Sequence, residues 1–307
     1  MSPSPTGAAG RFKAIRLMCL AVALFSCLDT TAKVLNSQLG VPVTQTVWMR
    51  FLVQFVGLIV LVPAFGVMPA RSMFRSANTG WQLVRSVLMA ATTLFNFLAL
   101  QTLRLDQTIT IVFLAPLVVA LLAGPLLGEW VGWRRMLAIL TGFAGVLVAV
   151  HPAADGMDFA VVYSLLAMLA YALFMLLTRH IGGSDPPMVT LFYSMFVGTF
   201  FGAPFALANW VWPDNAKTWL LLFSMGLFGG LGHYVFLLAY RLAPASSIAP
   251  LLYTQILTMA GLGYLVFSDK PDVWTLSGAA IVVGSGIYLF HREHAALRIP
   301  KAVGTPA

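Results

Sequence analysis

Long runs of apolar residues fill this chain, and short polar segments rich in Pro, Gly and Asp separate the runs. A bilayer core of about 30 Å requires about 20 helical residues, and most of the runs reach that length. The pattern therefore predicts an all-α polytopic membrane protein with ten transmembrane helices. The predicted spans are 14–36, 43–64, 80–101, 107–127, 134–151, 158–179, 188–208, 217–240, 246–266 and 273–291.

The ten runs divide into two sets of five, and an odd number of spans forces a second copy of the unit to insert upside down. Inverted repeats of this kind build many secondary transporters. At an offset of 140 residues the segment from Ala99 matches the segment from Ala239 in hydropathy, and Glu129 aligns with Asp269 in the turn before a last helix. The expected parts are a disordered N-terminal tail at 1–10, repeats at 11–152 and 153–292, and a C-terminal tail at 293–307.

Charge adds an orientation to this pattern. Only 9% of the residues are charged, against roughly 25% in soluble domains, so lipid must be the solvent of this chain. With the N-terminus in the cytoplasm, thirteen basic residues fall inside and four outside, which is typical of the positive-inside rule. We therefore expect both termini in the cytoplasm and a multi-pass protein of a bacterial inner membrane. The net charge of +8 is scattered among short loops, which argues against a nucleic-acid partner.

The sequence carries no pattern of an enzyme. It lacks a nucleophile elbow, an HExxH motif, a pair of intramembrane aspartates and a nucleotide-binding loop. It also lacks the spacings of zinc or haem sites. We expect a protein without enzymatic activity, cofactor or metal, in which a solute or ion gradient drives transport.

Prolines interrupt the fourth and ninth predicted spans, at Pro116 and Pro250. Proline removes a backbone donor and kinks a helix, and a membrane tolerates this where protein or a water-filled cavity satisfies the freed carbonyl. Interrupted helices at matching places in two halves indicate a transport site. We predict that these kinks take part in gating, and a purely structural kink is the alternative.

Three charged residues fall inside the first two spans. Asp29 and Lys33 are four residues apart and share one helix face, and Arg50 lies at a depth similar to that of Asp29. Each such charge costs about 2.5–3.5 kcal/mol on insertion, so we expect a cluster that handles a substrate carboxylate or gates the outer side. The alternative is a structural ion pair between the two helices, with Lys33 reaching to the interface.

Further residues are expected to line a central cavity. His233 is the one histidine well inside a predicted span, and its imidazole suggests proton coupling, although a structural hydrogen bond is the alternative. Aromatic side chains with polar tips and uncharged polar groups suit the walls of a solute site. The remaining candidates are Trp48, Asn96, Tyr171, Tyr234, Tyr253 and Gln255.

Two segments in the halves have the same build, a polar-small start, an apolar run and a turn before the next helix: Ala99 to Pro116 with Gly128-Glu129, and Ala239 to Gln255 with Ser268-Asp269. Together with Phe25 to Lys33, they resemble the ten-helix EamA-type branch of the drug/metabolite transporter superfamily over about residues 11–292. The resemblance implies two halves around a central cavity that opens to one side at a time. The expected partners are a small-molecule substrate and the lipid bilayer. We expect the chain to be a monomer.

The substrate stays open between hypotheses. The mostly uncharged polar lining and the many aromatics favour export of aromatic and other neutral amino acids, as in bacterial exporters that this chain resembles. The combination of Asp29, Lys33 and Trp48-Met49-Arg50 also resembles cofactor carriers of the same branch, so uptake of a metabolite of the S-adenosylmethionine or riboflavin type is the alternative. A passive channel is the alternative from another class.

Overall fold

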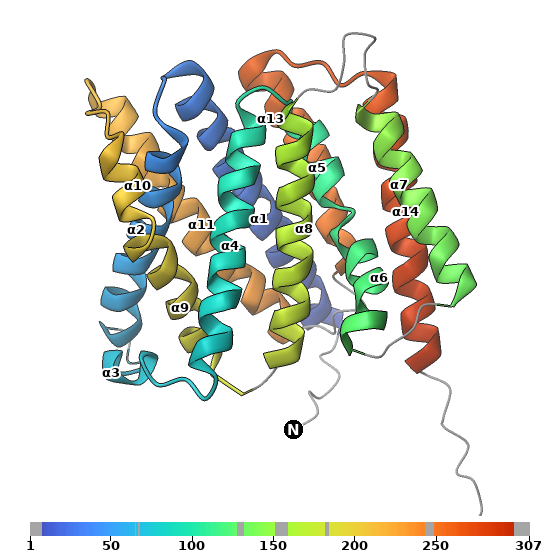
Figure 1. The fold of residues 1–307 in the computed structure, drawn as a ribbon, viewed down its shortest axis with the longest axis horizontal. Coiled ribbons are helices and arrows are strands. Elements are labelled where there is room, and N and C mark those ends of the chain that lie inside the picture. The colour runs from blue at the N-terminus through green and yellow to red at the C-terminus, as the bar shows by residue number, and fades with distance from the viewer. Residues whose placement is uncertain are drawn as a thin grey trace, which may run out of the picture.

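The computed structural model describes residues 8–64, 66, 68–127, 132–150, 159–181, 184–242 and 249–297. Within these ranges every regular element is helical (Figure 1). The first half contains α1 (Ala8–Lys33), its π-helical extension η1 (Val34–Gln38), α2 (Val43–Ala64), α3 (Ala70–Met73), α4 (Thr79–Leu100), α5 (Leu105–Val112), α6 (Ala115–Leu127) and α7 (Trp133–Val150). The second half contains α8 (Phe159–Ile181), α9 (Pro187–Phe200), α10 (Ala203–Ala208), α11 (Ala216–Leu242), η2 (Ala249–Tyr253), α13 (Thr254–Phe267) and α14 (Val273–Leu297).

Many of these helices have the length and composition of membrane spans. Among the described residues, seven helical segments are long and apolar enough to cross a membrane. Three shorter apolar helices, Met136–Ala149, Leu251–Phe267 and Val273–Tyr288, coincide with the predicted fifth, ninth and tenth spans. The all-helical, multi-pass architecture is thus as expected, while the count of ten spans and the cytoplasmic termini stay predictions.

Both predicted proline interruptions lie close to the junction of two helical segments. The fourth predicted span divides into α5 and α6, which begins at Ala115 with Pro116 as its second residue. Since proline has no N–H, it cannot continue the hydrogen-bond ladder of the preceding turn, and a new helix begins there. Pro250 lies in the 3-10 helix η2, directly ahead of α13. A role of either residue in gating stays a prediction.

The contacts between the two halves follow the symmetry of the repeat. The closest pairs are α1 with α11, α4 with α8, and α7 with α14. If the first five spans map onto the second five, the pair α1–α11 is the counterpart of the pair α4–α8, and α7 and α14 correspond to each other. Such an exchange of partners is expected where two inverted repeats pack around a pseudo-two-fold axis. In Figure 1, α7 and α14 form one edge of the molecule, α2 and α10 the other, and α1 lies in the middle behind α4 and α8.

The bundle is apolar outside and holds polar groups inside. Large apolar side chains face outward, among them Leu147 on α7, Leu220 on α11 and Leu265 on α13. Arg50 and Arg85, by contrast, are almost completely buried. Because charged groups inside a membrane protein are costly, buried ones are candidates for a functional site.

Candidate functional site

A polar cluster forms where α1, α2, α4 and α11 meet. Asp29 on α1 accepts a hydrogen bond of 3.1 Å from the amide Nδ2 of Asn96 on α4. One turn before Asn96, the Thr93 hydroxyl accepts a hydrogen bond from Nη1 of Arg50 on α2. The charges of Asp29 and Arg50 attract each other across this space, although no ion pair within 4.0 Å joins them. Three of the sequence candidates, Asp29, Arg50 and Asn96, therefore lie together.

Two further side chains, Gln54 and His233, complete the cluster. Gln54 follows Arg50 by one helical turn and so lies on the same face of α2. A methyl group on Gly229 of α11 would overlap the side-chain amide of Gln54 and would lie 3.6 Å from Arg50 Nε. His233 follows Gly229 by one turn on α11, and its ring lies 5.0 Å from that of Phe25 on α1. The close approach of α2 and α11 at Gly229 thus positions the amide of Gln54.

Several polar atoms of this cluster have no partner among the described residues. They are Arg50 Nε, both Nε2 and Oε1 of Gln54, and Nε2 of His233, and all are buried. A buried donor or acceptor without a partner costs about 1–3 kcal/mol, so most are paired in folded proteins. These four atoms are therefore candidates for contacts with a bound solute. Gln54 offers a donor and an acceptor side by side, and Arg50 adds a second donor.

Aromatic rings surround these polar atoms. The Arg50 guanidinium lies 5.4 Å from the Phe51 ring centroid and 6.0 Å from that of Phe97. Phe25 packs edge-on against His233 and against Phe236, whose ring centroid is 6.3 Å away. Aromatic faces beside a few convergent polar groups suit a flat ring system with polar edges.

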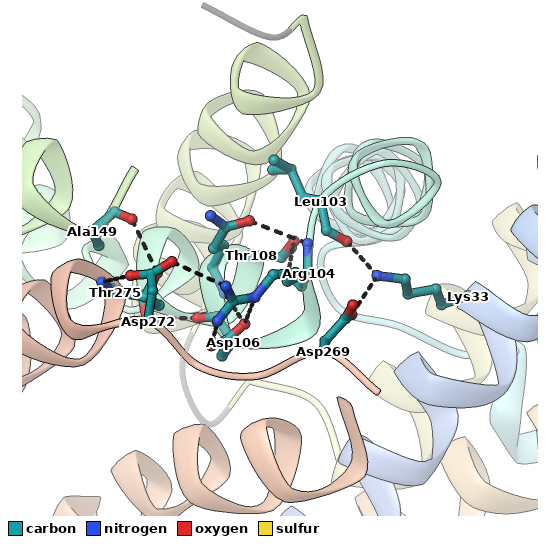
Figure 2. Close-up of polar contacts among 11 residues, drawn as sticks. Lys33, Leu103, Arg104, Asp106, Thr108, Ala149, Asp269, Asp272 and Thr275 are labelled. Atoms are coloured by element: carbon teal, nitrogen blue, oxygen red, sulfur yellow. Dashed lines mark hydrogen bonds and ion pairs between the residues drawn. The ribbon is translucent and has the colours of Figure 1, made fainter. Parts of the chain in front are cut away.

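Lys33 does not join the cluster that its shared face with Asp29 predicts. Its Nζ donates a hydrogen bond of 2.9 Å to the carbonyl oxygen of Leu103 and forms an ion pair of 3.3 Å with Asp269 Oδ2. The ammonium also lies 4.8 Å from the centroid of the Phe267 ring. Lys33 therefore connects the end of α1 both to the turn before α5 and to the loop between α13 and α14 (Figure 2).

Arg104 makes a second connection between the same two loops. Its guanidinium bonds Asp106 Oδ2 at 2.6 Å and Asp272 Oδ2 at 3.0 Å (Figure 2). Asp272 also accepts the backbone N–H of Thr275 at 2.6 Å, at the start of α14. Partial burial raises the pKa of Asp272, but the Thr275 N–H and the Arg104 charge outweigh it and hold that pKa below its usual value. We call the contacts of Lys33 and Arg104 with Asp269 and Asp272 the outer network, because the charge count predicts this end to lie outside.

A polar connection also joins the halves at the opposite end. Asp185, between α8 and α9, accepts hydrogen bonds from Ser76 Oγ at 2.6 Å, from Ala77 N at 2.8 Å and from Gln82 Nε2 at 2.9 Å. Desolvation raises the pKa of Asp185, but these three donors outweigh it and lower that pKa below its usual value. The loop between α3 and α4 is thereby fixed to the second half.

The described contacts of the other candidates are with residues outside the central cluster. Trp48 Nε1 donates a hydrogen bond of 2.8 Å to the Thr199 carbonyl oxygen, and its ring packs on Trp210. Trp48 thus joins α2 to α9. Tyr234 is 53% exposed and faces away from the interior. Tyr171 stacks on Phe174 of its own helix, Tyr253 packs edge-on against Phe113, and Gln255 is buried on α13.

Sequence reasoning missed Gln54, Gly229 and Arg85. The spacing of four residues between Arg50 and Gln54 is a usable signal for the first. Arg85 counted only toward the orientation, yet it is 3% exposed and donates to Ser194 Oγ at 2.6 Å and to the Thr190 carbonyl at 2.8 Å. Nothing in the sequence reveals that α4 packs on α8 and α9, and this packing buries Arg85.

Comparison with known proteins decides the family. Residues 12–150 and 158–290 both match the EamA-like transporter family. The chain belongs to this family. The EamA resemblance of the sequence is thereby confirmed, and the protein is a membrane transporter of the drug/metabolite superfamily.

Individual members of the family differ in what they carry. The chain is 28% identical to a riboflavin transporter of Vibrio cholerae over 90% of this chain and 92% of that protein. It is 29% identical to an S-adenosylmethionine uptake transporter of Rickettsia felis over 62% of this chain and 65% of that protein. A pseudopaline exporter of Pseudomonas aeruginosa is 25% identical over 90% of this chain and 95% of that protein.

A solved crystal structure shares the fold of this EamA-like chain. It superposes with a TM-score of 0.62 at 19% sequence identity and covers 93% of this chain and 99% of the other. At this identity the likeness shows the fold alone.

Proposed function

We propose that this chain is a secondary transporter of a bacterial inner membrane that takes up a heterocyclic cofactor-class metabolite of the riboflavin type. The observation that carries the proposal is the set of buried, unpaired polar atoms on Arg50 and Gln54. The flavin ring system carries an imide edge, in which carbonyl oxygens flank an N–H. The adjacent acceptor and donor of Gln54 complement such an edge, and Arg50 Nε supplies a donor to a ring carbonyl.

Two further observations support a flat aromatic solute. The rings of Phe25, Phe51 and Phe97 lie beside the polar atoms and provide surfaces for stacking. Riboflavin transporters of Vibrio cholerae, Brucella anthropi and Rhizobium johnstonii are 28%, 25% and 24% identical to this chain, each over 90% of it. The likeness to these proteins therefore extends over both halves, including α11.

The outer network acts as the outer gate in this proposal. Lys33 lies one turn beyond Asp29 on α1, so its bonds to Leu103 and Asp269 close the path above the central cluster. Breaking them lets α1 separate from the loops that begin α5 and α14. The solute then reaches Arg50 and Gln54 from outside, and closure of the network precedes release on the inner side.

A zwitterionic substrate is the second candidate, and the pairing of charges in the cluster favours it. Asp29 is placed to bind an ammonium group and Arg50 a carboxylate, which together match the amino-acid end of S-adenosylmethionine. The Rickettsia relatives support this candidate over about three fifths of the chain. Export of neutral amino acids stays a prediction, because none of the relatives described above is named for that substrate.

Transport by the full chain in proteoliposomes tests the proposal. Labelled riboflavin is offered outside, with unlabelled riboflavin, S-adenosylmethionine and single amino acids as competitors. We expect saturable uptake that unlabelled riboflavin inhibits and that the other solutes leave unchanged. Competition by S-adenosylmethionine or amino acids, with no riboflavin uptake, would assign the site to a zwitterion. Flux that rises linearly with concentration would indicate a channel.

Direction and coupling need separate measurements. A bacterium that can neither make nor import riboflavin should grow on a low external concentration when it produces this chain. An imposed pH gradient should change the uptake rate if protons drive transport. If neither the gradient nor His233→Ala changes the rate, the hypothesis of proton coupling through His233 is rejected.

A further inference from the structure

A hollow opens between α7 and α14 on the outer surface of the bundle. The two helices touch closely near one end, where a side chain on Gly145 would lie 2.8 Å from Ile281 and 3.0 Å from the carbonyl oxygen of Gly278. Farther along α14 a side chain on Gly284 would meet nothing within 4 Å. The helices therefore diverge toward the beginning of α7, the end of the bundle at which α1 begins (Figure 1).

This hollow of about 430 Å³ has mixed walls. Its polar and aromatic lining comes from Trp133, Arg134 and Thr141 on α7 and from Ser285 and Tyr288 on α14. Trp133 is 67% exposed and Tyr288 is 45% exposed, so the hollow opens outward from the bundle.

The wall deeper in the membrane is apolar. Leu137 lines the hollow, and Leu140 follows it along the same helix. Both side chains are more than half exposed. Because α7 and α14 form an edge of the bundle, this apolar surface faces acyl chains rather than other helices.

The polar wall suits a phosphate group. The Arg134 guanidinium lies 5.2 Å from the Trp133 ring centroid, and within the described ranges no carboxylate lies at ion-pair distance from it. Charge counting predicts this end to be cytoplasmic, where basic pockets between membrane helices bind anionic lipid headgroups. Trp and Tyr are the residues that membrane interfaces select.

The hydroxyl groups of the hollow act as acceptors. The Thr141 hydroxyl donates a hydrogen bond of 2.8 Å to the Leu137 carbonyl oxygen, and the Ser285 hydroxyl donates one of 2.9 Å to the Ile281 carbonyl oxygen. Their oxygens can still accept hydrogen bonds from a headgroup that carries hydroxyls of its own. A glycerol headgroup beside a phosphate meets both requirements.

We propose that the hollow between α7 and α14 binds one anionic phospholipid of the phosphatidylglycerol type. Its phosphate lies at Arg134, its headgroup hydroxyls donate to Thr141 and Ser285, and its acyl chains lie along Leu137 and Leu140. The site is separate from the central cluster and independent of which solute is carried. A bound lipid would fill the gap that the two diverging helices leave and hold this edge of the bundle together.

Native mass spectrometry of the full chain, taken from nanodiscs, tests this site. One set of nanodiscs contains phosphatidylcholine alone, and the other contains about one fifth phosphatidylglycerol. Arg134→Gln removes the phosphate contact, and Gly284→Leu fills the hollow. Arg71→Gln is the matched control, since Arg71 is an exposed arginine on α3, outside the hollow.

We expect the unchanged chain and the Arg71→Gln variant to retain one phosphatidylglycerol. Arg134→Gln should lower that occupancy about fivefold, and Gly284→Leu should also lower it. Equal retention in all four proteins, equal loss in the control, or equal binding of phosphatidylcholine would overturn the proposal. A dimer that Gly284→Leu dissociates would assign the hollow to a second copy of the chain instead.

Discussion

Lys33 and Asp269 form an ion pair of 3.3 Å between Nζ and Oδ2, although 236 residues separate them in the chain. Their side chains are 9% and 26% exposed, so water and salt screen this pair less than a pair on an open surface. Because Lys33 also donates to the Leu103 carbonyl, one ammonium group holds α1, the turn before α5 and the loop before α14 together. The ion pair thus links the two halves of the protein.

Replacing Lys33 by Met should loosen this end of the bundle. Without the ammonium, the Leu103 carbonyl and the Asp269 carboxylate lose their partner, at a cost of about 1 kcal/mol, or about fivefold in the population of the open form. A cysteine at Thr30, which is 7% exposed in the closed structure, reports this opening. In a chain without Cys19 and Cys27, we expect an impermeant maleimide to label Thr30→Cys faster when Lys33 is replaced.

The control for that experiment is Lys270→Met. Lys270 is exposed and directly follows Asp269, so its loss changes the local charge without breaking the ion pair between Lys33 and Asp269. If both variants label at the rate of the parent chain, the ion pair does not close the path above the cluster.

Arg50→Ala and Gln54→Leu should impair transport more than membrane insertion. Each change removes donors or acceptors that would bind the solute, and a hydrogen bond to a charged or buried group is worth about 1–3 kcal/mol, or roughly 5–150-fold in affinity. Initial uptake rates at limiting solute, divided by the amount of protein in the membrane, measure the effect. Gln101→Leu, at an exposed position after α4, is the matched control and should transport normally. Full activity in the Arg50 and Gln54 variants would remove these residues from the site.

The helices are well predicted because the bilayer itself constrains them. The predicted second span at 43–64 and the helix α2 coincide, since a run of apolar residues of this length has no other stable state in lipid. The break between α5 and α6 likewise follows from chain chemistry, because Pro116 cannot donate to the preceding turn. These features depend on local sequence alone.

The site is predicted only as far as local rules reach. The sequence places Arg50 within a span, but it pairs Lys33 with Asp29 on one helix face, whereas the ion pair with Asp269 depends on how α1 packs against the second half. Gly229 shows the same limit. Gly229 leaves room for the side-chain amide of Gln54, and this matters only because α2 and α11 lie side by side.

Gly229→Ala should block the site while the helix stays intact. Alanine favours helix over glycine, yet its methyl group would overlap the Gln54 amide and approach Arg50 Nε. We expect uptake to fall at least about tenfold, with normal protein levels in the membrane, because the amide must rotate away from its binding position. Gly261→Ala on α13 is the matched control, since a methyl group there meets nothing within 4 Å. Equal activity of both variants would mean that Gln54 tolerates displacement and does not orient the solute.

Acid should weaken the outer network through Asp272. The Thr275 N–H and Arg104 outweigh partial burial and hold the pKa of Asp272 below its value in an unfolded chain, which is about 3.9. A group of this kind adds stability above the unfolded pKa, and that stability disappears as pH falls through the lower folded pKa. We therefore expect Asp272→Asn to lower the thermal unfolding midpoint of the purified chain at neutral pH, and the difference from the parent to shrink below about pH 4. Asp214→Asn, at an exposed position before α11, should leave the midpoint unchanged at every pH. A difference for Asp272→Asn that stays constant down to about pH 3 would show that the carboxylate charge does not contribute.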